Sequence, residues 1–346
     1  MEHPTQSVDY EAPFNPRADG YQIPGGSSSG SASAIASYDW LDFSIATDGA
    51  VSTEGVISVY PGYDTPGVFG RDLAKFENFI WNWYGEGIKN KSIKSPRLFV
   101  PPDFFTDITG HQLELVEHFI EDLEISLQTK VHRQSIAETW KKSAPVDERD
   151  INVYLENATQ HSYYHAAFHA FDGFRKAYKA KYNRAPFITE SNRWLWQLGS
   201  EVSSKERDDM NNRIQTFRTW FLKHYMKSDE QDTIIILPIS QVKPNYRDAF
   251  TSQIGKKATT GLRTTYLSPY VGAPELAVPI GHLNFESRIS GNTESLPVAV
   301  AVMGPPGSDM ALVKLVLESL RASKRPTAVS TGKARMWSPE EESGSS

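Results

Sequence analysis

Short apolar runs alternate along this chain with amphipathic helical patterns, and this alternation limits its possible folds more than any other feature. Residues 97–100 and 233–237 are largely apolar, and a proline follows or ends each run, as is common for buried strands. Two more apolar runs, residues 276–280 and 298–303, lie near the end of the chain. We therefore predict an α/β fold in which helices cover a sheet.

Apolar residues at steps of three and four predict the helices between these runs. Residues 151–182 are helical in character throughout. Ser203 and Glu206 fit a capping box, in which the serine hydroxyl accepts a hydrogen bond from the backbone N–H three residues later, so a helix is predicted to begin there. The other expected elements are strands at 43–47 and within 56–68, and helices at 73–83, at 113–127 and from Ser308 onward.

Composition excludes several classes of protein. The 346 residues include no cysteine, which excludes disulfides, a thiolate nucleophile and a cysteine-ligated metal. The formal charge of −6 gives no basic footprint for a nucleic acid or an anionic membrane as partner. The chain has no apolar run long enough for a membrane helix, and its polar start lacks the apolar core of a signal peptide. We expect a cytoplasmic protein with one domain over residues 1–337 and a disordered polar tail at 338–346.

A small-residue loop, Pro-Gly-Gly-Ser-Ser-Ser-Gly-Ser at residues 24–31, leads directly into an alanine-rich helical stretch. A flexible linker has this composition, but it would not normally feed a helix. A phosphate-binding loop would need a lysine after the last glycine, where this chain has Ser31 and Ala32. Local features alone leave a linker and a functional loop open.

The loop and the blocks around it resemble the amidase signature family. The family pattern G-G-S-S-G-G-x-A/G-A matches residues 25–32, with Ser29 in place of a glycine, and residues 46–48 match the start of its G-T-D-T-G-G-S-I-R segment. Residues 39–43 are similar to those of fungal members. Further family motifs are matched, in family order, at 51–56, 64–72, 272–281 and 296–304.

This resemblance implies an α/β fold with a mixed β-sheet sandwiched between α-helical layers. It also implies hydrolysis of the carboxamide C–N bond of a small-molecule amide, without a metal or organic cofactor. In the family a neutral lysine is the base, one serine relays protons and a second serine attacks the carbonyl. By motif position Ser27 matches the relay serine and Ser28 its neighbour, and the resemblance assigns substrate binding to Gly25, Gly26 and Ser28. A strained or cis bond between Gly26 and Ser27 is expected with this motif.

Two parts of the Ser–Ser–Lys triad lack a match. The family's lysine lies many dozens of residues before the relay serine, whereas the first lysine of this sequence is Lys75. Ser52, four residues after Asp48, is the candidate nucleophile by count, although residues 52–56 fit better as the strand that follows a deleted nucleophile loop. Three interpretations stay open: an incomplete amidase-family hydrolase, a non-catalytic pseudoenzyme or binding protein that keeps the scaffold, and an imperfect gene model.

His161, His165 and His169 repeat at steps of four and would share one face of a helix, where zinc or nickel could bind. The glutamate of an H-E-x-x-H motif is missing, and the alternative is a helix with partly exposed imidazoles packed among aromatic residues. We therefore assign no metal site. Core or pocket-wall positions are expected for Trp81, Trp83, Trp194 and Trp196.

Overall fold

A computed structural model describes residues 11–47, 59–60, 63–64, 66–88, 91–226, 230–249 and 261–333. The candidate nucleophile Ser52 and the expected tail at 338–346 lie outside these residues.

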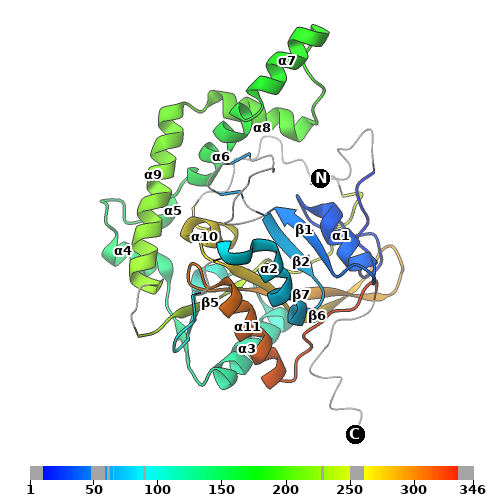
Figure 1. Ribbon diagram of the computed structural model, residues 1–346, viewed down its shortest axis with the longest axis vertical. Coiled ribbons are helices and arrows are strands. Elements are labelled where there is room, and N and C mark those ends of the chain that lie inside the picture. Colours follow the sequence, from blue (N-terminus) through cyan, green and yellow to red (C-terminus); the bar gives the residue numbers. More distant parts are fainter. Residues whose placement is uncertain are drawn as a thin grey trace.

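A five-stranded sheet with the order β4-β3-β5-β7-β6 lies at the centre of the fold (Figure 1). Strand β3 runs parallel to β4 and β5, whereas β7 is antiparallel to β5 and β6. The predicted mixed sheet is therefore confirmed. The strands are β3 (Arg97–Val100), β4 (Val131–Arg133), β5 (Thr233–Pro238), β6 (Glu275–Glu286) and β7 (Thr293–Met303).

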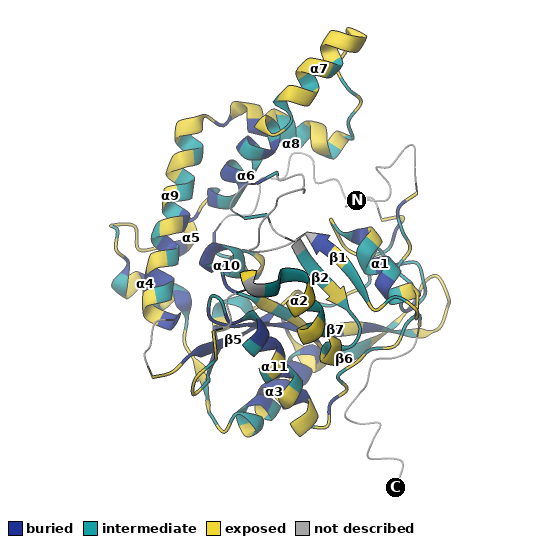
Figure 2. Ribbon diagram, in the orientation of Figure 1, coloured by how far each residue is buried: buried dark blue, intermediate teal, exposed yellow. Residues whose placement is uncertain are grey.

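Alternate residues of the central strands enter two separate cores, one on each face of the sheet. Phe99 and Ile235 pack on one face against α4 (Ile136–Ser143), α9 (Ser204–Phe221) and α10 (Thr264–Val271). Leu98 and Ile234 pack on the other against α3 (Gly110–Ser126) and α11 (Asp309–Ala322). All six residues of β5 are buried, which explains why this strand is apolar without alternation (Figure 2).

A second, two-stranded sheet pairs β1 (Phe43–Thr47) with β2 (Pro66–Gly70) in antiparallel register. Helix α1 (Ser29–Ser37) packs on it. Strand β1 lies where it was predicted. Of the expected 56–68 strand and loop, the described strand begins only at Pro66, and residues 56–58, 61–62 and 65 lie outside the described ranges.

The helical stretch 151–182 is divided into α5 (Ile151–Tyr154), α6 (Ala158–His169) and α7 (Asp172–Tyr182). Asn157, with a left-handed φ of 59°, stands between α5 and α6. Helix α8 (Glu190–Glu201) packs on α6, and α7 projects from the body of the molecule (Figure 1). The remaining helices are α2 (Phe76–Tyr84), the 3-10 turns Leu73–Lys75, Gly85–Gly87 and Pro102–Phe104, and the π-turn Leu222–Met226.

One aromatic expectation was wrong. Trp81 is 50% exposed on α2, because the helical spacing places it on the exposed side with Glu77, Asn78 and Asn82, away from the half-buried Phe76, Phe79 and Trp83. Trp194 and Trp196 are half-buried. In the described ranges, every helix is too short or too polar to cross a membrane.

Candidate functional site

The glycine–serine loop is an ordered turn at the start of α1. The side chain of Ser29 is buried and donates to the carbonyl of Gly25 at 2.6 Å, and Ala32 N–H donates to Ser28 O at 3.1 Å. Gly25 has a φ of +82°, a backbone conformation that suits glycine. The peptide bond between Gly26 and Ser27 is cis, as predicted. Ser27 is exposed and Ser28 is half-buried.

Distant parts of the chain hold the segment that leads into this loop. Gln22 is buried and accepts from Asn245 N–H, and Ile23 N–H donates to Asn245 O at 2.9 Å. The buried Arg247 donates to the carbonyls of Ala12 and Pro13 and stacks over Phe14. Sequence reasoning missed these contacts because they join residues more than 200 positions apart.

On its other side the loop is tied to β1. Ser31 Oγ donates to Ile45 O at 2.6 Å, and Ser44 Oγ donates to Ser31 O at 2.9 Å. The loop and the strand that leads toward Asp48 are therefore neighbours, as they are in the family motif. The position of Ser52 relative to Ser27 is not part of the described structure.

Lys75, the first lysine of the sequence, forms an ion pair with Asp42. Lys75 Nζ lies 2.6 Å from Asp42 Oδ1, and both side chains are about half-exposed. Asp42 directly precedes β1, so the ion pair lies at the start of this strand, at the opposite end from Thr47.

The three histidines do lie along α6, but each has its own surroundings. His161 Nδ1 lies 2.8 Å from Glu206 Oε1, and His169 Nδ1 lies 2.9 Å from Asp172 Oδ2. His165 is buried between them. Its pKa is lowered mainly by this burial and to a smaller extent by the nearby charge of His169. Among the described residues, no three His, Asp or Glu side chains converge on a point that could hold a metal ion.

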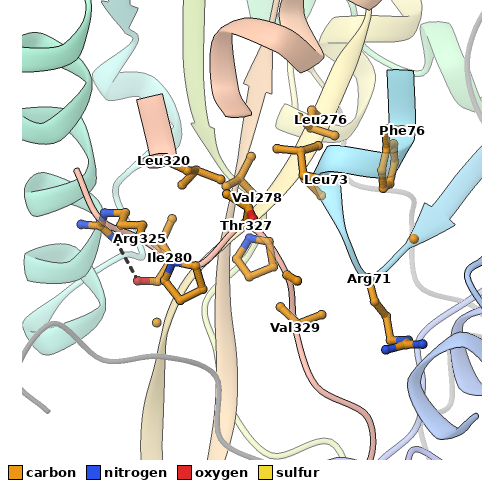
Figure 3. Close-up of a pocket in the computed structure, with 16 residues that line it drawn as sticks. Arg71, Leu73, Phe76, Leu276, Val278, Ile280, Leu320, Arg325, Thr327 and Val329 are labelled. Carbon is orange, nitrogen blue, oxygen red and sulfur yellow. Dashed lines mark hydrogen bonds between the residues drawn. The ribbon is translucent and has the colours of Figure 1, made fainter. Parts of the chain in front are cut away.

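A pocket lies away from the loop, between edge strand β6 and the segment after α11 (Figure 3). It measures about 650 Å³ with its open mouth and is lined mainly by apolar side chains such as Leu73, Val278 and Leu320. Arg325 closes one end, where it donates to Ile280 O at 3.1 Å and pairs with Asp122. None of residues 25–28 lines this pocket, so it is not part of the candidate serine site.

Comparison with known sequences gives distant relatives. Amidase 1 of Oryza sativa subsp. japonica is 39% identical over 90 residues, which cover 20% of each chain. The glutamyl-tRNA(Gln) amidotransferase A subunit of Sulfurihydrogenibium sp. (strain YO3AOP1) is 24% identical over 351 residues, which cover 85% of this chain and 66% of that protein. The chain thus spans less than two thirds of these relatives. No protein-family model matches it.

Solved structures share the fold. The urea amidolyase of K. lactis matches with a TM-score of 0.68 and 15% identity over 97% of this chain and 20% of that one. The glutamyl-tRNA(Gln) amidotransferase A subunit of Thermotoga maritima matches with a TM-score of 0.61 and 17% identity, over 97% and 74% of the two chains. A crystal structure described as an amidase matches with a TM-score of 0.60 and 18% identity, over 89% and 69%.

Three observations therefore agree: the mixed sheet between helical layers, the motif blocks in family order, and relatives that include an amidase and a glutamyl-tRNA(Gln) amidotransferase A subunit. Its sequence relatives and its fold support placing the chain with the amidase signature family.

Proposed function

We propose that this protein is an amidase-family hydrolase whose scaffold serves the cleavage of a carboxamide C–N bond in a small molecule. Water adds to the carbonyl carbon, and the amine leaves with a proton. The observation that carries the proposal is the place of Ser27, exposed in the ordered loop before α1, where the family motif has its relay serine. The names of a sequence relative, Amidase 1, and of a structural neighbour, an allophanate hydrolase of Kluyveromyces lactis, support this substrate class.

The 346 residues alone are proposed to be catalytically incomplete. A serine hydroxyl is a weak nucleophile until a base removes its proton. Residues 1–26 contain no lysine, and Lys75 is paired with Asp42. Ser52 is the nucleophile candidate by motif count. Ser27 could pass a proton along, but it needs a lysine to receive it. We expect hydrolysis of simple amides and esters by this chain to be far below that of a complete Ser–Ser–Lys site.

Labelling with a fluorophosphonate probe, combined with amine release from aryl and aliphatic amides, tests this proposal. We expect neither labelling nor turnover, and no difference between the wild type and the variants Ser27→Ala and Ser52→Ala. Labelling of Ser52 together with turnover that is lost in Ser27→Ala would contradict the inactivity and establish a working relay.

The second candidate is a non-catalytic protein that keeps the amide-binding loop. The observation that favours it is the intact packing of the loop, in which Ser29 Oγ donates to Gly25 O. This candidate predicts that small amides raise the melting temperature without being cleaved, and that the bulky variant Gly26→Val abolishes the increase. The absence of any amide-dependent shift would contradict it.

A further inference from the structure

Helix α7 has no buried residue along its whole length. Helices α6 and α8 pack on each other, and α6 also packs on α9, whereas α7 extends beyond them at one end of the molecule (Figure 1). Its surface is mostly exposed (Figure 2). Arg175 fixes its first turns, because the guanidinium lies 3.8 Å from the centre of the Phe168 ring and 4.7 Å from that of Trp196. Beyond these turns, most of the helix is exposed with respect to the part of the chain that the structure describes.

An aromatic stripe runs along one side of α7. Phe174, Tyr178 and Tyr182 follow one another at steps of four, with ring centroids 5.9 and 4.6 Å apart. Phe174 is 50% exposed and Tyr182 is 49% exposed. Phe187, in the loop after the helix, is 68% exposed and extends the apolar surface. A stripe of this kind does not arise from core packing, because no element among the described residues buries Phe174 or Tyr182.

Cations surround the stripe. Residues 172–184 contain five lysines and arginines and a single acid, Asp172, and residues 173–189 contain no acid at all. Lys176, Lys179, Lys181 and Arg184 are exposed, and none of them forms an ion pair with a carboxylate of the described residues. The net charge of −6, on which the expectation of no membrane partner rested, hides this local excess of positive charge.

We propose that α7 and the loop after it dock onto an anionic lipid surface. A helix with an aromatic side and a lysine-rich flank can lie in the plane of a bilayer, with its rings among the headgroups and its ammonium groups near the lipid phosphates. The cations provide attraction to a negative leaflet, and the stripe provides apolar contact. Because the stripe is convex and continues into the loop, a broad flat surface fits it better than a narrow protein groove does.

Co-sedimentation of the full chain with vesicles tests the proposal. The lipids are phosphatidylcholine alone and phosphatidylcholine with phosphatidylserine, at low salt and at about 0.5 M NaCl, which screens surface charges. The test variants are Lys179→Glu and the pair Phe174→Ser and Tyr182→Ser. Lys141→Glu, at an exposed lysine on α4, is the matched control. The α7 variants remove no buried side chain, so circular dichroism should show an unchanged fold.

We expect binding only to phosphatidylserine vesicles and its loss at high salt. Lys179→Glu should weaken it by about thirtyfold, since two units of charge change near the surface. The double serine variant should also weaken binding, and Lys141→Glu should bind like the wild type. The proposal is overturned if the wild type ignores phosphatidylserine vesicles, or if all variants bind equally. Binding to polyglutamate but not to vesicles would overturn it as well, and would assign α7 to an acidic protein partner.

Discussion

Gly199 of α8 lies directly against the backbone carbonyl of Tyr164 in α6. A Cβ atom at this glycine would be 2.1 Å from Tyr164 O and 2.8 Å from Phe168 Cβ. Because the first of these atoms belongs to the backbone, no side-chain rotation can relieve the contact. The absence of a side chain at position 199 therefore sets how closely α8 approaches α6.

Gly199→Ala should destabilise the protein by about 1–3 kcal/mol, because the added methyl forces the two helices apart. Gly173→Ala is the control, since nothing lies within 4 Å of the corresponding Cβ and alanine favours a helix. Urea unfolding measures both variants. An unchanged midpoint for Gly199→Ala would show that α8 moves freely relative to α6.

His165 should make the stability depend on pH. Its pKa is lowered in the fold, by burial first and then by His169 and Arg207, while Asp208 and Asp172 oppose the shift. The folded state therefore favours the neutral ring, and the unfolded chain binds the proton more readily. The stabilisation is complete above the unfolded pKa of about 6.5 and is lost as the pH falls below it.

Urea unfolding at pH 7.5 and pH 5.5, two values chosen to lie on either side of about 6.5, tests this linkage. His165→Gln should lose less stability on acidification than the wild type does. His118→Gln, at an exposed histidine of α3, should retain the wild-type dependence. Parallel pH profiles for all three proteins would contradict the role assigned to His165.

The features that could be predicted from the sequence are local ones. The Ser203 cap is confirmed, since Glu206 N–H donates to Ser203 Oγ at 3.1 Å, and this contact spans only three residues. The apolar strands at 97–100 and 233–237 are also confirmed. Their apolar composition is itself a local feature, and it reflects their burial. The cis bond before Ser27 was predicted from the resemblance to the family motif, and neither composition nor periodicity indicated it.

Features that depend on distant contacts could not be predicted. Strand β4 is short, and only its pairing with β3 defines it as a strand. Asp103 is another example, because its carboxylate accepts from Ser135 Oγ, Ile136 N–H and Ala137 N–H, more than 30 positions away, at the start of α4.

Asp103→Ala should cost about 2 kcal/mol or somewhat more, because it removes an acceptor from a helix N-terminus whose donors are partly buried. Ser135→Ala should cost about 1 kcal/mol, since Asp103 can still accept from the two backbone N–H groups. Thermal unfolding followed by circular dichroism gives both values. The assignment is contradicted if Asp103→Ala is no more harmful than Asp107→Ala, a change at an exposed acid in the following turn.

Ser29 stands where the family motif has a glycine. Its buried hydroxyl donates to Gly25 O across the loop that carries Ser27. In Ser29→Ala that carbonyl loses its partner, so we expect a loss of about 1 kcal/mol and faster amide hydrogen exchange at residues 25–28. Ser29→Gly should loosen the loop further, because glycine also adds conformational freedom to the unfolded chain. Ser27→Ala changes an exposed side chain and should alter stability by less than about 0.5 kcal/mol.

Hydrogen exchange read by mass spectrometry separates these cases, since only the Ser29 variants should accelerate exchange in the loop while α1 beyond Ala32 stays protected. Equal exchange in all three variants would mean that the tie between Ser29 and Gly25 does not order the loop. The ties from α1 to β1 through Ser31 and Ser44 would then be its main support.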